Sequence, residues 1–361
     1  MLIILSSLLW LASQAPSTSL SWTQALSQPA PWYASAEAGR IAGTVRLYQR
    51  ESGGWPKNLD MAKPLTDTER ATVAAERRTA DSTIDNGATV QQIRYLARVH
   101  AANRDTRDRD AIVAGIDYLL EAQYPNGGWP QYFPLRPGYW SHITYNDSAM
   151  VNVMTLLDDI VTGDRWSIVD APRVARAREA LQRAIALTLQ LQIRVNGRLT
   201  GWCQQYDETT KEPANARAYE HPSIASMETV GIVRFLMTVS PPHDHAAART
   251  AIDGAVEWLR RSEIHGSRLE RRPNPAGPQG YDQVVVADPA APALWARFSD
   301  IATNRPIFSG RDGVIKNALA DIEIERRTGY SWLGTYAASL LAKEYPAWVA
   351  RQPGRRPGTV Q

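Results

Sequence analysis

The segment Asn126-Gly127-Gly128-Trp129-Pro130 marks a turn in a sequence whose apolar residues mostly follow the periodicity of α-helices. Its Gly-Trp pair occurs at two further places with nearly equal spacing, as Gly54-Trp55 and as Gly201-Trp202. A helical unit that recurs at a fixed interval indicates stacked pairs of helices. In this interpretation each glycine caps the end of a helix, and each tryptophan fills a gap between neighbouring repeats.

The first helix of each predicted pair begins at a polar cluster. These clusters are Asp85-Asn86, Asn146-Asp147 and Ser226-Met227-Glu228. Apolar residues recur every three to four positions after the first cluster, which predicts an amphipathic helix that begins near Asn86. Residues 150–160 and 227–239 are apolar almost all round, so we expect these two helices to be buried.

The C-terminal third departs from the repeat. The third helix pair, over residues 227–240 and 247–262, ends at Gly266 without a tryptophan. Residues 271–288 contain three prolines and two glycines, which predicts a long loop with a short strand over 283–287. One more helix is expected over about residues 330–345.

These patterns together predict an all-α fold with small β and loop additions. The expected architecture is an α/α toroid-like superhelix, or (α/α)3 barrel. In such a fold we expect the active cleft at the loop end, where the inner helices begin.

Composition narrows the class of partner. The chain has 361 residues, of which 44% are hydrophobic and 21% charged, and its net charge is +3. This mildly basic balance fits an anionic partner of modest charge density and argues against nucleic acid. Twelve tryptophans and fourteen tyrosines against four phenylalanines are typical of aromatic faces that meet water, as in carbohydrate clefts.

Other classes of site have no motif in this chain. The single cysteine, Cys203, excludes an internal disulfide and is expected to be a packed thiol. The sequence contains no Gly-x-Ser-x-Gly elbow, no phosphate-binding P-loop, no His-Glu-x-x-His and no Cys-x-x-Cys.

The two ends of the chain differ from its middle. Residues 1–15 are apolar and end in small residues near Ala15, as a secretory signal peptide does, although a basic start is missing. A short buried helix is the alternative, and the run is too short to span a membrane. We therefore expect a secreted protein, extracellular or periplasmic, with one domain over 16–349 and a disordered basic tail over 350–361. We expect a monomer, with no nucleic acid or membrane partner.

Asp85 and Asp147 begin successive repeats, and each has more than one interpretation. Alone, each would cap the N-terminus of its helix, a position that favours aspartate. Because both are expected at the same end of the fold, they could instead hold a hard cation such as Ca²⁺, with water and substrate oxygens completing the shell. They could equally be the acid and base of a glycosidase, and spacing does not decide between these roles.

Four arginines fall in loops expected around the same end of the fold. They are Arg217, Arg297, Arg305 and Arg311. Taken singly, each would be a surface arginine, and Arg305 and Arg311 would pair with acids such as Glu323 or Glu325. Planar guanidinium groups bind carboxylates through two parallel hydrogen bonds. A cleft with two aspartates and several arginines therefore suits a polymer of carboxylates bridged by a divalent cation.

Several ordered segments resemble the pectate lyases of polysaccharide lyase family 10, from about residue 53 to residue 345. The matching segments are Gly53-Gly54-Trp55-Pro56-Lys57-Asn58, Thr83-Ile84-Asp85-Asn86-Gly87-Ala88-Thr89, Asn126-Gly127-Gly128-Trp129-Pro130-Gln131, Asn146-Asp147, Gly201-Trp202-Cys203-Gln204-Gln205-Tyr206-Asp207, Ala216-Arg217-Ala218-Tyr219-Glu220, and Trp295-Ala296-Arg297-Phe298 through to Gly313. The resemblance implies an α/α toroid-like catalytic domain. It also implies calcium-dependent β-elimination of polygalacturonate by an arginine base, giving 4,5-unsaturated oligogalacturonides.

The resemblance also implies a role for each matching residue. Asp85 and Asp147 would belong to the calcium and substrate carboxylate site, and Arg217 would be the base. The substrate-binding residues would be Arg297 and Arg311, with Arg305 and Lys57 as further candidates. Two alternatives stay open: an inverting α/α-toroid glycoside hydrolase that uses Asp85 and Asp147, and a non-catalytic oligogalacturonide-binding protein.

Overall fold

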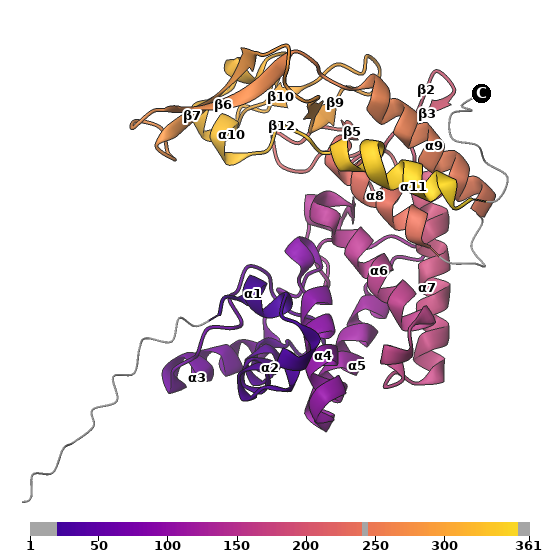
Figure 1. The fold of residues 1–361 in the computed structure, drawn as a ribbon. Coiled ribbons are helices and arrows are strands. Elements are labelled where there is room, and N and C mark those ends of the chain that lie inside the picture. Colours follow the sequence, from indigo (N-terminus) through magenta and orange to yellow (C-terminus); the bar gives the residue numbers. More distant parts are fainter. Residues whose placement is uncertain (1–19, 240–244, 353–361) are drawn as a thin grey trace, which may run out of the picture.

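The computed structural model describes residues 20–239 and 245–352, and Figure 1 shows its ribbon. The predicted signal peptide, residues 1–15, lies outside the described residues, as do residues 353–361 of the predicted tail. Within the two described ranges, no helix is both long enough and apolar enough to cross a membrane.

The long helices form two layers. Helix α2 (Ala36–Tyr48) precedes them in the chain. The first layer holds α4 (Val90–Asn103), α6 (Ala149–Thr162) and α8 (Ser226–Thr238). The second layer holds α5 (Thr106–Glu121), α7 (Ala171–Gln190) and α9 (His245–Arg261). Each helix packs against its partner in the pair and against the next helix of its own layer. The array forms an open arc in Figure 1, so the toroid-like stack of helix pairs is confirmed but does not close into a barrel.

Local sequence explains where these helices begin and which face they bury. The carboxylates of Asp105 and Asp170 accept backbone N–H groups in the first turns of α5 and α7, as helix caps do. On α4, the predicted apolar face is buried, since Val90, Ile93 and Leu96 are at most 3% exposed. Burying each such side chain stabilises the fold by roughly 1.5–3 kcal/mol.

Each repeat tryptophan is fully buried and bonds to the helix before it. The indole N–H groups donate to carbonyl oxygens at 2.7 Å, Trp55 to Val45, Trp129 to Leu119 and Trp202 to Thr188. A buried indole needs such a partner for its single N–H. The interpretation of these tryptophans as plugs between repeats is confirmed.

The glycines beside them serve the turn and do not cap the helices. Helix α5 ends at Glu121, well before the turn Gly127-Gly128 that precedes Trp129, and Gly127 in this turn has a φ of +98°. A Cβ at Gly127 would lie 2.5 Å from the carbonyl oxygen of Arg183 in α7. The glycine therefore lets the turn touch the next helix of its layer, and the predicted capping role was wrong.

The third helix pair has the same plug, which the sequence spacing conceals. Trp295 is buried, and its indole N–H donates to the carbonyl of Leu259 in α9 at 2.8 Å. A hairpin of β6 (Ser267–Pro273) and β7 (Tyr281–Ala287) intervenes between α9 and this tryptophan. The inserted hairpin lengthens the third unit, so the prediction of a pair without a tryptophan was wrong. The short strand predicted over 283–287 is confirmed as part of β7, but the rest of the predicted loop belongs largely to the hairpin, because β6 pairs with β7 along seven residues.

A glutamine recurs in the same way and was not predicted. The side-chain amides of Gln49, Gln123 and Gln192 each donate to a carbonyl of the following turn. Each also donates to a carbonyl of the next helix in the second layer, namely Ala111, Ala180 and Ala251. These amides tie each turn to the neighbouring repeat.

A second, smaller core lies beyond the helices, in the orange and yellow region of Figure 1. It contains Tyr219, Phe298, Phe308 and Trp332. Around it and elsewhere, short antiparallel strand pairs join distant segments: β1 (Ile143–Thr144) with β4 (Gln205–Tyr206), β2 (Arg194–Val195) with β3 (Arg198–Leu199), β5 (Ile224–Ala225) with β9 (Phe298–Ser299), β8 (Trp295–Ala296) with β12 (Leu333–Gly334), and β10 (Phe308–Ser309) with β11 (Ile315–Lys316).

The last helix begins later than predicted. The segment around Leu333 is extended because β12 pairs with β8, and helical structure starts near residue 338. It continues as the π-helical η8 (Leu340–Glu344) and α11 (Tyr345–Ala350). The other helical elements are α1 (Trp22–Leu26), η1 (Ala30–Ala34), α3 (Asp67–Ala75), η2 (Glu76–Arg78), η3 (Asp85–Gly87), η4 (Tyr139–Ser141), η5 (Asn146–Ser148), η6 (Asp164–Trp166), η7 (Leu319–Asp321) and α10 (Ile324–Gly329).

Candidate active site

Two 3-10 turns, η3 and η5, lead into the first-layer helices α4 and α6 and contact each other. Each turn has a left-handed residue in its middle, Asn86 with a φ of 51° and Asp147 with a φ of 49°. Non-glycine residues rarely adopt this conformation, although asparagine and aspartate tolerate it best. Non-glycine residues held in this conformation cluster at functional sites.

The two predicted carboxylates occupy different positions in these turns. Asp85 is the first residue of η3, whereas Asp147 is the second residue of η5. The structural equivalent of Asp147 is therefore Asn86, and that of Asp85 is Asn146. Neither carboxylate caps α4 or α6, because both helices begin without a side-chain cap.

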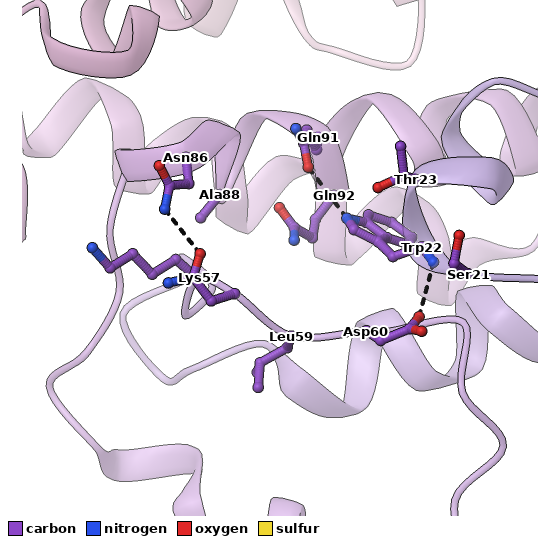
Figure 2. Close-up of a pocket in the computed structure, with 11 residues that line it drawn as sticks. Ser21, Trp22, Thr23, Lys57, Leu59, Asp60, Asn86, Ala88, Gln91 and Gln92 are labelled. Carbon is purple, nitrogen blue, oxygen red and sulfur yellow. Dashed lines mark hydrogen bonds between the residues drawn. The ribbon is translucent and has the colours of Figure 1, made fainter. Parts of the chain in front are cut away.

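Asp85 is buried and paired with a positively charged side chain. Its side chain is 4% exposed and forms an ion pair with the ammonium of Lys57. Burial lowers the pKa of Lys57, but the hydrogen bond and charge of Asp85 outweigh this effect and raise it. Lys57 and Asn86 lie at one end of a cavity of about 340 Å³, with Trp22 and Asp60 at its other end (Figure 2). Lys57 is thus engaged with Asp85, and its predicted contact with substrate stays a prediction.

Asp147 faces open space. Its side chain is 41% exposed and lines a cavity of about 470 Å³ together with Asn86, Ser148 and Asn152. One carboxylate oxygen accepts the Asn146 side-chain amide at 2.9 Å, and the other lies 3.8 Å from an Nη atom of Arg297. The cavity is therefore lined by an accessible carboxylate and other oxygen-bearing side chains.

Arg297 is held at the start of α8 by a residue that the sequence interpretation did not select. Its Nη2 donates to the carboxylate of Glu228 at 2.6 Å, and both side chains are almost fully buried. The Arg297 carbonyl accepts the backbone N–H of Ser226, which fixes the strand against the helix. Burial alone lowers the pKa of Arg297, but the charge of Glu228 raises it above its usual value. Glu228 stands in the third polar cluster at a helix start, and this was the one signal that pointed to it.

Arg217 lies in the loop between β4 and β5 and is paired with Glu220. Its side chain is 42% exposed, and its Nε donates to the Glu220 carboxylate at 2.7 Å, with a second contact from Nη2. Burial lowers the pKa of Arg217, yet the hydrogen bond and charge of Glu220 raise it overall. A base must accept a proton, so it must be neutral, whereas Glu220 favours the charged form of Arg217.

The ring of Tyr330 lies close to both Arg217 and Arg297. The guanidinium carbons of Arg217 and Arg297 are 5.6 Å and 5.3 Å from the centroid of the Tyr330 ring. The Tyr330 hydroxyl donates to the Glu220 carboxylate at 2.8 Å. The two arginines therefore belong to one cluster, which extends to Asp147 through Arg297.

The other two predicted arginines lie outside this cluster in the described contacts. Arg311 is exposed and bonds through Nε and Nη2 to Glu325 at 3.0 and 2.9 Å, so the simpler salt-bridge interpretation is confirmed for it. Arg305 is exposed, and the neighbouring Asn304 accepts the indole N–H of Trp258 at the end of α9. Substrate binding by Arg305 and Arg311 stays a prediction.

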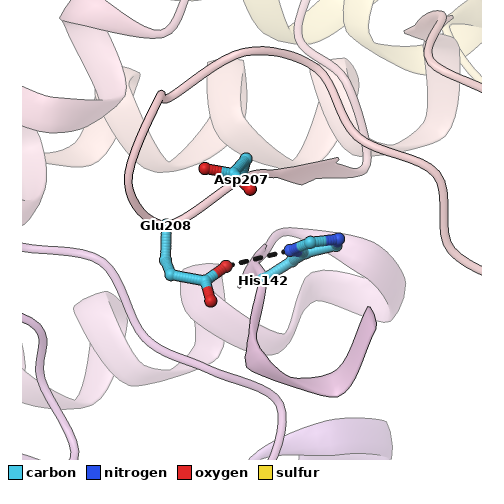
Figure 3. Close-up of side chains that lie close together, drawn as sticks. All are labelled: His142, Asp207 and Glu208. Atoms are coloured by element: carbon cyan, nitrogen blue, oxygen red, sulfur yellow. Dashed lines mark hydrogen bonds and ion pairs between the residues drawn. The ribbon is translucent and has the colours of Figure 1, made fainter. Parts of the chain in front are cut away.

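One further group of potential metal ligands lies beyond the end of the β1–β4 pair. Figure 3 shows this group, His142, Asp207 and Glu208. Among the described residues, these three have ligand atoms within 4.8 Å of one another. His142 Nδ1 lies 3.0 Å from the Glu208 carboxylate, and Asp207 accepts the backbone N–H groups of Thr209 and Thr210. The group is held by these contacts and contains neither of the predicted calcium ligands.

Comparisons with known proteins identify the family. The model of the pectic acid lyase family matches residues 49–341. A family 10 polysaccharide lyase from Cellvibrio cellulosa has 32% sequence identity and a TM-score of 0.73, over 89% of this chain and 96% of that chain. A mutant of family 10 polysaccharide lyase from the same organism, in complex with trigalacturonic acid, has 32% identity and a TM-score of 0.72, over 87% and 95%. A search of curated proteins found no match. The family match and the shared fold agree with the arginine–carboxylate cluster at the start of the helices. This chain therefore belongs to the pectic acid lyase family and is a pectate lyase.

Proposed function

We propose that the protein is a secreted pectate lyase that cleaves polygalacturonate by calcium-dependent β-elimination and releases 4,5-unsaturated oligogalacturonides. The observation that carries this proposal is the open carboxylate of Asp147 beside the buried charge of Arg297, at the head of the first-layer helices. Such a site offers a place for a cation and a positive charge for the carboxylates of an acidic polymer. The solved complex of a similar lyase with trigalacturonic acid supports this class of substrate.

The donor set of the Asp147 cavity fits calcium. Ca²⁺ prefers oxygen ligands from carboxylates, amides and water in a flexible arrangement. Asp147, with Asn86, Ser148 and Asn152, lines a cavity with this chemistry. Asp85 was predicted as a second ligand, but its carboxylate pairs with Lys57, so we assign it the task of holding Lys57 and the η3 turn. When bound, Ca²⁺ would neutralise the substrate carboxylate and make the neighbouring proton more acidic.

The residues of the chain supply the rest of the reaction. β-Elimination removes the C5 proton, which is α to the C6 carboxylate, and expels the glycosidic oxygen from C4. Negative charge develops on the carboxylate in the transition state, and fixed positive charge beside it lowers the barrier. We propose that Arg297, fixed by Glu228, provides this charge next to Asp147. We propose Arg217 as the base, because it is exposed and linked to Arg297 through Tyr330.

An arginine base requires alkaline conditions. The guanidinium of Arg217 is charged at neutral pH, and Glu220 raises its pKa further, so only a minute fraction is neutral. The neutral fraction rises with pH, and activity should rise with it. An activity maximum near pH 5 would exclude Arg217 as the base. With Arg217→Ala we expect a loss of turnover of about 10²–10⁴-fold with little loss of binding.

One measurement distinguishes the proposal from its alternatives. Polygalacturonate is incubated with the protein at alkaline pH, with calcium and then with a chelator, while ultraviolet absorbance reports the unsaturated product. Absorbance that grows with calcium and stops with chelator supports the lyase. New reducing ends without absorbance would indicate a glycoside hydrolase that uses Asp85 and Asp147, and binding without any product would indicate an oligogalacturonide-binding protein.

Export is part of the same proposal. The apolar run over residues 1–15 would direct the chain out of the cytoplasm, to the side of the membrane where the polymer is found. Mass spectrometry of protein purified from outside the cytoplasm should show an N-terminus close to Ala15. A chain that starts at Met1 would contradict export by cleavage.

We also propose that the protein works as a monomer. Gel filtration with light scattering tests this proposal.

A further inference from the structure

His142, Asp207 and Glu208 lie outside the arginine–carboxylate cluster, yet they bring three potential metal ligands together (Figure 3). The register of the β1–β4 pair explains why. It places Ile143 opposite Tyr206, and the same register continued by one residue brings His142 opposite Asp207. Opposite residues of an antiparallel pair place their side chains on the same face. Glu208 follows Asp207 in the chain and completes the group.

The two carboxylates of this group have no basic partner other than the histidine. Within residues 20–239 and 245–352, neither Asp207 nor Glu208 forms an ion pair with a lysine or an arginine. The contact of Glu208 is with His142 Nδ1 at 3.0 Å, and these two side chains are only 30% and 20% exposed. By contrast, the buried carboxylates of Asp85 and Glu228 each pair with a lysine or an arginine. Two adjacent, partly buried negative charges without a fixed positive side chain favour a cation from solution.

Neighbouring groups hold two of the three ligands in place. Oδ1 of Asp207 accepts the backbone N–H groups of Thr209 and Thr210 at 2.9 and 2.7 Å, which orients the carboxylate. The side-chain amide of Asn126 donates to the backbone carbonyl of Glu208 at 2.8 Å. Ligands that are already held by such hydrogen bonds lose less freedom when an ion binds, and outer partners of this kind are typical of metal sites.

We propose that His142, Asp207 and Glu208 form a transition-metal site for an ion of the Zn²⁺ class, separate from the calcium site proposed at Asp147. One imidazole nitrogen with two carboxylates is a ligand set that suits Zn²⁺, whereas Ca²⁺ takes oxygen ligands. The three ligand atoms lie within 4.8 Å of one another. A Zn²⁺ ion with bonds of about 2.1 Å holds its ligands at most ~4.2 Å apart, so the side chains need to approach one another by roughly half an ångström. Water would supply the fourth ligand.

The ion would clip together two segments that also hold the η5 turn. Beyond β1, the backbone N–H groups of Tyr145 and Asn146 both donate to the carbonyl of Gln204, at 2.8 and 3.1 Å. A metal ion at the other end of the same strand pair would join these segments a second time. An ion that binds only the folded state stabilises it by mass action, so the melting temperature should rise with the zinc concentration. This role does not depend on the proposed lyase mechanism.

Isothermal titration of the purified protein with zinc chloride, in calcium-free buffer, measures the site without substrate. For the wild type we expect one tightly bound ion and a higher melting temperature at saturating zinc. His142→Ala should weaken the binding by about 100-fold or more and abolish the rise in melting temperature. The matched control is His265→Ala. His265 also lies 3.0 Å from a glutamate, Glu263, but belongs to no group of three ligands among the described residues. The control should bind zinc as the wild type does.

A second variant keeps the inference testable if His142→Ala folds poorly. Glu208→Gln keeps the size of the side chain, and its backbone carbonyl can still accept the Asn126 amide, so we expect a folded protein with weakened zinc binding. Neither Asp147→Ala nor saturating calcium should change the zinc affinity. The inference would be overturned by a wild type that does not bind zinc, by binding that persists in both ligand variants, or by binding that is lost in Asp147→Ala.

Discussion

The turns η3 and η5 have nearly the same backbone, but they place their carboxylates differently. In η3 the aspartate stands first, is buried, and pairs with Lys57. In η5 the aspartate stands second, in the left-handed position, and lines an open cavity. A shift of one position within the same turn therefore separates a structural ion pair from an accessible carboxylate.

A repeated sequence therefore need not mean a repeated function. The residue at the first position of each turn, Asp85 in η3 and Asn146 in η5, is buried. The carboxylate of the one and the amide of the other bind different partners. Asn146 accepts from Arg297 at 3.3 Å, whereas Asp85 binds Lys57. We therefore expect substitutions on the η5 side to affect both chemistry and stability, and those on the η3 side to affect mainly stability.

The largest expected effect tests the support of the η5 side. Glu228→Gln removes the charge opposite Arg297 while it keeps the shape of the side chain. Leaving a buried charge without its partner costs about 3–5 kcal/mol. Urea denaturation should show this loss of unfolding free energy. The control is Asp159→Asn, which breaks the more exposed pair with Arg94 and should cost less than about 1 kcal/mol. Equal effects of the two variants would mean that the burial of this pair adds nothing to stability.

The next prediction compares the two aspartates directly. Asp147→Ala should lower kcat by about 10²–10³-fold, the loss expected for one charge-stabilising group, and excess calcium should restore part of it. Asp85→Ala should lower the melting temperature and should not respond to calcium. Absorbance assays over a calcium series measure both effects. Calcium rescue of Asp85→Ala would return Asp85 to the metal site and break the comparison.

An exchange within η3 sharpens the comparison further. Asp85→Asn combined with Asn86→Asp gives this turn the Asn-Asp order of η5, so a second carboxylate would enter the cavity that Asn86 lines. A further charged ligand should tighten calcium binding, by roughly tenfold. Isothermal titration with calcium alone measures the affinity without reference to activity. An unchanged affinity in the folded variant would show that the second position of η3 does not reach the cation.

The smallest effect is a pH-dependent loss of stability on the η3 side. Asp85 raises the pKa of Lys57 above its usual value, so the pair stabilises the fold at pH values below those at which Lys57 loses its proton. That contribution is lost as pH rises through the higher folded-state pKa. Because Lys57 is partly exposed, we expect a loss of only about 1 kcal/mol above this pH. Thermal melts of the wild type and Lys57→Met from pH 8 to pH 12 should converge at the alkaline end, and parallel curves would contradict the assignment.

Much of the architecture could be predicted from the chain alone. The recurring Gly-Trp turns and the apolar periodicity predicted stacked helix pairs, and the polar clusters marked the end where the candidate site lies. These features are local. The spacing of apolar residues indicates a helix, and a tryptophan is recognisable as a plug by its size and its single N–H donor. The fourth plug, Trp295, was missed because an inserted hairpin hides its interval, and strand pairing at a distance leaves only a weak local signal.

The sequence alone predicted two aspartates and several arginines at the head of the helices, and hence an acidic polymer as partner. Of the four predicted arginines, Arg217 and Arg297 lie in the cluster beside Tyr330. Only the tertiary structure decided how each is used. It buried Asp85 against Lys57, opened Asp147 to a cavity, brought Glu228 to Arg297, and paired Arg217 with Glu220 beside Tyr330. The physical reason is that charge acts through distance and burial. Both depend on which way a side chain leaves its turn and which distant segment packs against it.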